Sequence, residues 1–514
     1  MKKNKEADVL IIGGGIAGTA IARELSKYNV KIILVEKGCE LANGQTKMAT
    51  ASVYSGLAMI GSLIAKSILL KLGEPLCDSN GFKMKWCEMG FKEWPKIFED
   101  LDVKYIRLPV LVFARDEEEL KGLDHYEKVA HQMGGEYENS YRKVDRDEIF
   151  ELEPNLTKDA IRGLYDENHL IDVFPPELAI ALAENATQNG VEVLLDSEVT
   201  NISQNNTHQI VKTKQGNIKT NYIINCAGGY AYKIAQMGGG CDFKYNLKTS
   251  TLIIFDRTKR NLINSMVRTP CKPGFLAFLK PTAHGNLMGT SGNYGEVDNP
   301  EDTEIILEQG IKGANEVSGL VPSITRKDVI NLWRGVRVFS TKVPDDYLVE
   351  FSPFNNKMIN IVLRAPGITG SLGLSRHIVK MLSEAGLKLE KKNNFNPRRK
   401  SIPRFRELSD EERNELIKQD PRYGHVICRC ETVTEGEIVE AIKRGAICEQ
   451  GIKFRTRAGM GRCKRGFCGP RVIEILAREL KIPVTEVVKR SSNSVLIPYK
   501  AKEILLEKEE VFAK

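Results

Sequence analysis

Five of the eleven cysteines fall in a short segment near the C-terminus, between Cys428 and Cys468. Cys428 and Cys430 are one residue apart, and a second pair, Cys463 and Cys468, follows after 32 residues. Four thiolates in two close pairs can hold either zinc or an iron–sulfur cluster. Structural zinc sites usually have at least two residues between paired cysteines, so the spacing favours a cluster. Cys448, which lies between the pairs, is predicted to be a buried spectator.

A second chemical motif lies near the N-terminus, where an apolar run at residues 8–12 precedes a glycine triplet. The triplet consists of Gly13, Gly15 and Gly18. Between a strand and a helix, such glycines let the backbone approach a pyrophosphate, which the helix N-terminus then stabilises. Glu36 ends the next apolar run, where a carboxylate can accept hydrogen bonds from ribose hydroxyls. The arrangement predicts a dinucleotide site and disfavours the 2′-phosphate of NADP.

Three strings of residues resemble the D-amino-acid oxidase superfamily of flavoproteins. They are Ile-Ile-Gly-Gly-Gly-Ile-Ala-Gly at 11–18, Asn-Cys-Ala-Gly-Gly at 225–229 and Pro-Gly-Ile-Thr at 366–369. Within the superfamily, nearly the whole chain resembles the large subunits of anaerobic glycerol-3-phosphate dehydrogenases and the related 2-hydroxyglutarate oxidoreductases. The resemblance implies a bound FAD that is lined by Gly13, Gly15, Gly18, Glu36, Thr46, Val199, Gly228, Gly367, Ile368 and Thr369.

The cysteine segment has a resemblance of its own. The strings at 428–438 and 456–463 resemble the bacterioferritin-associated-ferredoxin-like (BFD-like) domain, which is fused to those dehydrogenase subunits. This resemblance implies a [2Fe–2S] cluster held by Cys428, Cys430, Cys463 and Cys468. The nearby basic residues could favour the reduced cluster, dock an acidic partner or simply be solvated, and all three alternatives stay open. They are Arg429, Lys453, Arg455, Arg457, Arg462, Lys464 and Arg465.

The substrate side is marked by fewer residues. In the superfamily, a Gly-x-Arg string like that at 335–337 places an arginine over the flavin, so Arg337 is predicted to grip a substrate carboxylate or phosphate. Glycerol-3-phosphate dehydrogenases usually carry a histidine and an arginine where this chain has Tyr54 and Ala58. Tyr54 is therefore the candidate proton-relay group. His284 is predicted to lie at the surface, and His377 to be a packed or capping residue.

The pattern of elements predicts an α/β fold with an α+β substrate layer. We expect a Rossmann-like FAD-binding domain with an inserted mixed antiparallel sheet, followed by a small, mainly helical [2Fe–2S] domain. The oxidoreductase domain is predicted over 1–390, with FAD-binding parts at about 1–75, 150–235 and 335–390 and a substrate layer at about 76–149 and 236–334. A basic linker at 391–421, a BFD-like domain at 422–490 and a charged tail at 491–514 should complete the chain.

Composition restricts the class of protein further. The net charge of +8 over 514 residues is modest and gives no indication of nucleic-acid binding. The most apolar stretch, at 57–72, is too short and polar to span a bilayer, and scattered single cysteines suggest a reducing compartment. A cytoplasmic location is expected. The segment 391–406 has seven basic residues and no acid. It is predicted to be a solvated linker, and an anionic partner or the inner membrane face is the alternative.

These observations together predict an FAD-dependent dehydrogenase that transfers hydride from a small anionic alcohol to flavin, with glycerol 3-phosphate as the first candidate. Electrons would then pass through the cluster to an NADH-linked flavoprotein subunit, a ferredoxin or a quinone-linked partner in a hetero-oligomer. A 2-hydroxy acid, an amino acid, a proline-like compound or an opine is the alternative substrate. Two further alternatives are a non-catalytic electron-transfer subunit and a zinc-bearing regulatory flavoprotein.

Overall fold

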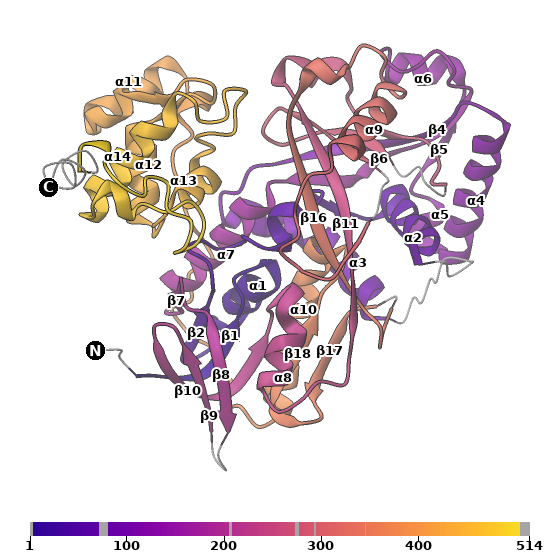
Figure 1. The fold of residues 1–514 in the computed structure, drawn as a ribbon. Helices are drawn as coiled ribbons and strands as arrows, with labels where there is room; N and C mark the ends of the chain where they lie inside the picture. Colours follow the sequence, from indigo (N-terminus) through magenta and orange to yellow (C-terminus); the bar gives the residue numbers. More distant parts are fainter. Residues whose placement is uncertain are drawn as a thin grey trace, which may run out of the picture.

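The computed structural model describes residues 4–70, 81–204, 208–272, 277–291, 295–344 and 346–503. The predicted boundary at 75/76 and the end of the predicted tail, from 504 onward, lie outside the described residues. Figure 1 shows two sheet layers that together form the larger part of the molecule, and a separate group of C-terminal helices beside them. In the described part of the chain, no helix has the length and apolar character that crossing a membrane requires.

An eight-stranded sheet contains the predicted strand–glycine–helix unit. Its order is β17–β18–β10–β1–β2–β7, and β8 and β9 extend it as an antiparallel pair beside β10. The strands β18, β10, β1, β2 and β7 are parallel, so their carboxyl ends meet at one edge. The bounds are β1 (Lys5–Ile12), β2 (Ile32–Val35), β7 (Glu192–Leu194), β8 (Val199–Gln204), β9 (Gln209–Thr213), β10 (Gly216–Asn225), β17 (Leu348–Ser352) and β18 (Asn355–Val362).

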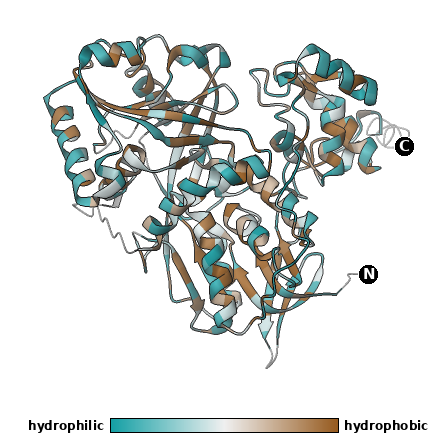
Figure 2. Ribbon diagram, turned by 180° about the vertical axis from the view of Figure 1, so that it is seen from behind, coloured by the Kyte–Doolittle hydropathy of each residue, from teal (hydrophilic) through white to brown (hydrophobic). Residues whose placement is uncertain are grey.

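Both faces of this sheet are covered. Val9 and Ile11 of β1 belong to a core shared with helix residues such as Ile21, whereas Leu10 and Ile12 belong to a core shared with β8, β9 and α8. Side chains along a strand alternate between faces, so a strand covered on both sides must be apolar throughout. Figure 2 shows this apolar character as brown strands in the sheet interior. The helices are α1 (Ile16–Leu25), α7 (Pro175–Gln188), α8 (Ala231–Met237) and α10 (Gly367–Glu384).

A ten-stranded mixed sheet forms the second layer. Its order is β15–β11–β14–β13–β12–β4–β6–β3, with β16 paired to β11 and β5 paired to β6. Neighbouring strands are antiparallel except β12 and β4, which are parallel. The bounds are β3 (Ser52–Tyr54), β4 (Tyr105–Ala114), β5 (Arg142–Val144), β6 (Arg162–Val173), β11 (Tyr245–Phe255), β12 (Met266–Arg268), β13 (Phe278–Pro281), β14 (Leu287–Ser291), β15 (Glu296–Val297) and β16 (Val329–Ser340).

Two strands of this sheet depart from the predicted division of the chain. β3 and β6 fall in ranges that we assigned to the FAD-binding parts, but both pair within the ten-stranded sheet. The reason is that β6 pairs along its length with β4, a partner that local sequence pattern does not indicate. The helices of this layer are α2 (Gly56–Leu70), α3 (Phe82–Asp100), α4 (Glu117–Met133), α5 (Gly135–Glu138), α6 (Arg146–Leu152) and α9 (Leu307–Ser318).

The C-terminal domain, residues 402–503, has its own hydrophobic core. Ile438, Ile452 and Leu476 are fully buried there together with Cys428 and Cys468. A capping box between Thr434 and Glu437 begins the central helix α12. Its elements are α11 (Asp410–Gln419), β19 (Val426–Cys428), β20 (Val433–Thr434), α12 (Glu435–Lys443), α13 (Glu449–Thr456) and α14 (Cys468–Leu480). The fold class predicted from the sequence is confirmed.

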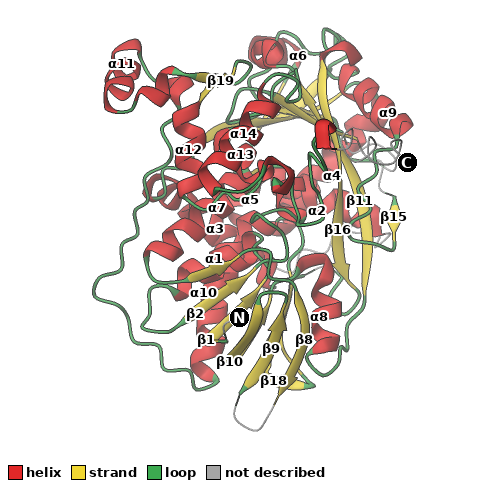
Figure 3. Cartoon of the chain, turned by 60° about the vertical axis from the view of Figure 1, so that its left-hand side comes forward, coloured by secondary structure: helices red, strands yellow, loops and turns green. Residues whose placement is uncertain are grey.

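The segment predicted as a solvated linker is partly held against the oxidoreductase layers. The backbone amide of Lys392 donates to Lys27 at 2.8 Å, and Tyr28 forms a β-bridge with Lys391. Arg399 is only 8% exposed and pairs with Glu184 of α7 at 2.6 Å. The expectation of a solvated linker holds only in part. Lys391, Arg398 and Lys400 are exposed, whereas Arg399, Arg404 and Arg406 bind carboxylates that are distant in sequence. Figure 3 draws the connection from α10 to the C-terminal helices as a long loop along the molecule.

His284 also departs from its prediction. It lies in a turn, as expected, but is only 5% exposed, because Arg406 from the C-terminal domain and Glu177 of α7 enclose it. Glu177 accepts from His284 at 3.0 Å and from Arg404 at 2.7 Å. His377 is packed, as predicted, against the rings of Phe82 and Trp86. The C-terminal domain is thus joined to both sheet layers through buried polar contacts.

Candidate active site and cysteine site

A cavity of about 700 Å³ lies at the carboxyl ends of the parallel strands. Ligands of open α/β sheets bind at such an edge. The cavity extends from Glu36, at the end of β2, to Tyr54 on β3 and Arg337 on β16. It is therefore formed between the two sheet layers, with walls from segments spread across almost 500 residues of the chain.

The glycine triplet forms the tightest part of the cavity wall. Gly13 has φ +111°, and a Cβ there would lie 2.4 Å from the carbonyl oxygen of Cys226. A Cβ at Gly18 would lie 2.0 Å from the carbonyl oxygen of Gly13, so Gly18 serves helix–strand packing and does not line the cavity. Gly15 lines the cavity and precedes α1. These positions allow a ligand to contact the backbone at the start of the helix.

Thr46 and Glu36 complete this end of the cavity. The hydroxyl oxygen of Thr46 accepts from the amide of Ile16, the first residue of α1, at 3.0 Å. The carboxylate of Glu36 accepts from Gly14 at 2.8 Å and from Gly38 at 2.9 Å. Burial raises the pKa of Glu36, and these two amides act in the opposite direction. A helix N-terminus beside a fixed carboxylate suits a pyrophosphate and a ribose, respectively.

The remaining predicted flavin residues divide into two groups. Val199, Gly228, Gly367 and Ile368 line the cavity. Thr369 does not line it, because its side chain is fully buried and its hydroxyl accepts from the amide of Tyr54 at 3.3 Å. Thr369 thus connects the start of α10 to β3.

The start of the predicted charged tail also lines the cavity. The carbonyl of Arg490 accepts from the side chain of Asn43 at 3.2 Å and from the amide of Cys39 at 3.4 Å. Residues 490–493 consequently form part of the wall near Glu36. The sequence pattern gave no signal for this contact, because only the docking of the C-terminal domain brings these segments together.

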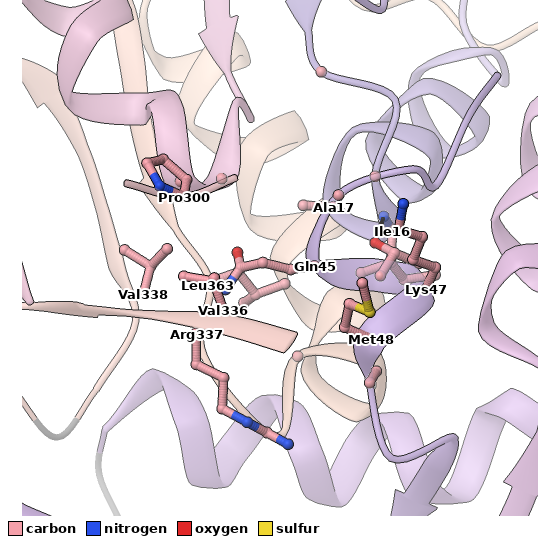
Figure 4. Close-up of a pocket in the computed structure, with 18 of the residues that line it drawn as sticks. Ile16, Ala17, Gln45, Lys47, Met48, Pro300, Val336, Arg337, Val338 and Leu363 are labelled. Atoms are coloured by element: carbon pink, nitrogen blue, oxygen red, sulfur yellow. Dashed lines mark hydrogen bonds between the residues drawn. The ribbon is translucent and has the colours of Figure 1, made fainter. Parts of the chain in front are cut away.

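At the opposite end, the two predicted substrate residues face the same cavity. Nε of Arg337 donates to the hydroxyl of Ser250 at 3.0 Å, and the hydroxyl of Tyr54 donates to Ser62 of α2 at 3.0 Å. Figure 4 shows that Arg337 extends from its strand to the side opposite Val338, while Gln45, Lys47 and Met48 line another wall. The structure therefore brings Arg337 and Tyr54 together, as the prediction requires.

Sequence reasoning missed a second arginine, Arg268, which is 6% exposed and lines the cavity from β12. The strand register explains why it faces the same way as Arg337. Arg337 pairs with Lys248 of β11. Lys248 shares its face with Leu252, four residues later, and Leu252 pairs with Thr290 of β14, which pairs in turn with Phe278 of β13. The next residue, Leu279, points to the other face and pairs with Val267 of β12, the residue before Arg268. Because directly paired residues share a face, Arg268 falls on the face of Arg337.

Arg268 also lies beside the helix that lacks the expected cation. A Cβ at Gly61 of α2 would be 3.1 Å from a guanidinium nitrogen of Arg268. Gly61 is three residues after Ala58, and on a helix both therefore point to one side. Ala58, Gly61, Ser62, Ala65 and Lys66 all line the cavity. Arg268 thus supplies positive charge close to the position where Ala58 supplies none.

The four predicted cluster cysteines meet at one place in the C-terminal domain. The thiol of Cys428 lies beside that of Cys468, and the thiol of Cys430 lies beside that of Cys463. Among the described residues, no three His, Cys, Asp or Glu side chains surround a single point that could hold one metal ion. Two thiol pairs fit the two irons of a [2Fe–2S] cluster better than they fit one tetrahedral zinc.

The surroundings of the cysteines shift the pKa values of their thiols in different directions. The neighbouring thiol of Cys468, against the opposing effect of burial, lowers the pKa of Cys428 to about 6. The backbone amides of Glu431 and Gly459 act in the same direction as Cys468. A thiol that ionises readily suits an iron–sulfur cluster. Cys448, in contrast, is fully buried and donates to the carbonyl of Cys39, and burial raises its pKa to about 12.

Comparison with known proteins agrees with both sites. The family model for FAD dependent oxidoreductases matches residues 8–381, and that for the BFD-like [2Fe–2S] binding domain matches residues 426–478. A glycerol 3-phosphate dehydrogenase of Caloramator mitchellensis is 34% identical over 503 residues, which cover 95% of this chain and 98% of the relative. The anaerobic glycerol-3-phosphate dehydrogenase subunit A1 of Haloferax volcanii is 25% identical over 539 residues, covering 92% of this chain and 83% of the relative.

Among solved structures, the dithionite-reduced L-alpha-glycerophosphate oxidase from Mycoplasma pneumoniae with FAD bound has the same fold. Its TM-score is 0.67 at 23% identity, and the match covers 77% of this chain and 98% of that one. With the nucleotide cradle, the two thiol pairs and these matches, the chain belongs to the FAD dependent oxidoreductase family and carries a [2Fe–2S] domain at its C-terminal end.

Proposed function

We propose that this protein is a dehydrogenase of small anionic alcohols, with glycerol 3-phosphate as the first candidate, and that its electrons leave through the [2Fe–2S] domain. The observation that carries the proposal is the common cavity of Arg337 and Arg268, both on one face of the ten-stranded sheet. Two guanidinium groups in one cavity suit a phosphate or carboxylate substrate. The names of the Caloramator and Haloferax relatives support a phosphorylated alcohol.

The side chains around the cavity have distinct roles in this proposal. Arg337, held by Ser250, binds the anionic group and orients the substrate, while Arg268 adds charge on the side of α2. The hydroxyl of Tyr54, fixed by Ser62, can hold or relay the proton of the substrate hydroxyl. The small side chains of Ala58, Gly61 and Ala65 leave room beside them. When bound, FAD supplies hydride acceptance and the [2Fe–2S] cluster supplies one-electron acceptance.

The electron route is the second part of the proposal. A one-electron centre on the same chain suits an enzyme whose acceptor is a separate carrier or subunit, rather than one that reduces oxygen directly. Four thiols beside backbone amides, in a domain packed on α7 through Phe454 and Phe174, support this route. The name of the Haloferax relative, a subunit, supports an assembly with further chains.

Anaerobic titration with glycerol 3-phosphate, followed by flavin absorbance, tests the substrate. We expect bleaching of the flavin in the wild type and a loss of about 100-fold in the second-order bleaching rate in Arg337→Gln, because a charge-assisted bidentate contact is removed. Arg337→Lys keeps the charge but loses the bidentate guanidinium, so its bleaching rate should lie between those of the wild type and Arg337→Gln. Bleaching by 2-hydroxyglutarate alone would instead support the alternative hydroxy-acid substrate, which the Tyr54 and Ala58 differences leave open. Bleaching by neither compound, nor by proline, would overturn the proposal in favour of an electron-transfer subunit.

A further inference from the structure

One aromatic side chain in the cysteine loop is unusually exposed. Phe467 is 72% exposed, more than any other large hydrophobic side chain in the described part of the chain. It belongs to none of the hydrophobic cores and makes no ring contact among the described residues. It lies immediately before α14, and the amide of the preceding Gly466 donates to the carbonyl of Cys463 at 2.9 Å. The exposed phenyl ring thus belongs to the residue directly before Cys468, one of the predicted cluster ligands.

The surface around this ring is positively charged. In the two loops that carry the cysteines, 428–431 and 461–471, every exposed charged residue is basic, and the acid Glu431 is buried with Arg406 and Arg457. The two loops are in contact, because a Cβ at Gly461 would lie 2.2 Å from the Cβ of Cys430. Arg471 is four residues after Phe467 at the start of α14, so the two lie on one side of that helix. The exposed residues are Arg429, Lys464 and Arg471, together with Arg462, which is paired with Asp256 at 2.8 Å. The next exposed charge along α14 is the acid Glu474.

The same side of the loop offers the easiest access to the sulfur atoms. Cys428 and Cys468 are each 1% exposed, whereas Cys430 and Cys463 are partly exposed. A redox partner that approaches from any other direction would meet the core of the C-terminal domain or its contacts with α7 and His284. The exposed edge of the Cys430–Cys463 pair therefore coincides with Phe467 and its basic surroundings.

We propose that Phe467 and the four basic residues Arg429, Arg462, Lys464 and Arg471 form the docking surface for an acidic, one-electron carrier protein. This inference rests on the proposed function, because it names where the electrons leave. The occupant follows from charge complementarity: an aromatic centre with a rim of one sign of charge is typical of an interface in which the ring anchors and the rim steers. Contacts between redox proteins are small and transient, which suits a single exposed ring.

Binding of an acidic [2Fe–2S] ferredoxin to the oxidised holoprotein tests the proposal without turnover. We expect saturable binding that weakens steeply with added salt, about 30-fold weaker binding in Phe467→Ala and about tenfold weaker binding in the double variant Arg429→Glu, Lys464→Glu. Phe467→Leu, which keeps an apolar side chain, should retain most of the affinity. Lys121→Glu, an exposed reversal on the distant α4, is the charge control. The cluster spectrum of each variant checks that the cysteine loop is intact.

Three results would overturn the docking surface. The first is an equal affinity of all variants for ferredoxin. The second is a weaker ferredoxin affinity in the Lys121→Glu control as well. The third is binding of the wild type to anionic phospholipid vesicles without binding to ferredoxin. The failure of the proposed function is a separate outcome. It would appear as an absence of flavin bleaching by the candidate substrates, while the ferredoxin affinities still follow Phe467 and its basic surroundings.

Discussion

The two redox sites of this chain are built in opposite ways. The flavin cavity takes its walls from both sheet layers and from residues 490–493 of the C-terminal domain. The cysteine site takes its four thiols from two short loops within 41 residues. A large cofactor with several chemical parts needs walls from many elements, whereas a small cluster needs only four sulfurs and a tight local backbone.

The two sites are nevertheless connected. Arg455 of α13 forms a buried pair with Glu40, close to Glu36, and lies 3.6 Å from Glu184 of α7. Phe454 packs edge-on against Phe174. The comparison therefore predicts that each cofactor can be lost separately, while damage at the interface affects the whole molecule.

The largest expected effect is the loss of the cluster in Cys463→Ser. Removal of one thiolate should abolish the [2Fe–2S] absorption and reduce the iron content to near zero, because four thiolates are needed. Flavin content and substrate bleaching should remain, since the cavity contains none of these cysteines. Metal analysis measures the iron content, and the visible spectrum measures the cluster and flavin absorption. Cys448→Ser is the control and should retain its iron. Parallel loss of flavin and iron in Cys463→Ser would refute the independence of the sites.

Gly13→Ala should have the opposite result, which is a loss of flavin with the iron retained. The new Cβ would collide with the carbonyl of Cys226 at a φ of +111°, so FAD affinity should fall by about 100-fold, equivalent to ~3 kcal/mol of strain. The iron content should not change, because the cysteine loops fold locally. Gly424→Ala is the control, since a Cβ at Gly424 would lie 3.5 Å from Ile417 and Gly424 does not line the cavity. Flavin release followed by fluorescence gives the affinity, and an unchanged value in Gly13→Ala would show that the cradle tolerates this collision.

Glu177→Gln should destabilise the interface between the C-terminal domain and the sheet layers. Glu177 accepts from His284 and Arg404, and removal of its charge leaves the buried His284 and the partly buried Arg404 without this carboxylate, at a cost of about 3 kcal/mol. Despite burial, which acts to raise it, the pKa of Glu177 is lowered by His284 and Arg404. A carboxylate with a depressed pKa stabilises the folded state above its unfolded pKa of 4.5, and this contribution is lost as the pH falls below that value.

The thermal midpoint should therefore drop in Glu177→Gln at pH 7, and the difference from the wild type should shrink toward pH 4. Calorimetry at the two pH values measures it. Glu117→Gln, an exposed change on α4, should leave the midpoint unchanged at both. A difference of the same size at pH 4 and pH 7 would show that the charge of Glu177 is not responsible.

The smallest effect is expected from Arg268→Gln. Because Arg268 also contacts the carbonyl of Thr269 and the sulfur of Cys271, only part of its charge is available to a substrate. We expect about a tenfold rise in KM for glycerol 3-phosphate with little change in kcat. Steady-state kinetics with an artificial acceptor measures both constants. If kcat fell by the same factor, Arg268 would act in the transition state rather than in substrate binding.

Residue spacing and periodicity along the sequence were enough to predict much of the fold and of the candidate sites. The run before Gly13, the triplet itself, Glu36 and the four cysteines were all found from spacing, because their roles depend on a backbone turn or on a pair of near neighbours. The fold class followed from the same periodicity. Arg268 could have been suspected only from its charge within a short apolar strand, which is a weak signal. His284 was misjudged, and the 391–406 segment was misjudged in part, because polarity alone does not show which distant carboxylate or carbonyl will bind a basic side chain.

The sequence by itself determined that a flavin domain and a [2Fe–2S] domain share this chain, and it predicted the residues that would hold the two cofactors. Only the tertiary structure decided that Arg268 and Arg337, on strands separated by three others, share a sheet face and a cavity. It also decided that residues 490–493 of the C-terminal domain close one wall of the flavin cavity. The physical reason is that strand register and domain docking are set by buried surface summed over many residues, and no local pattern records that sum.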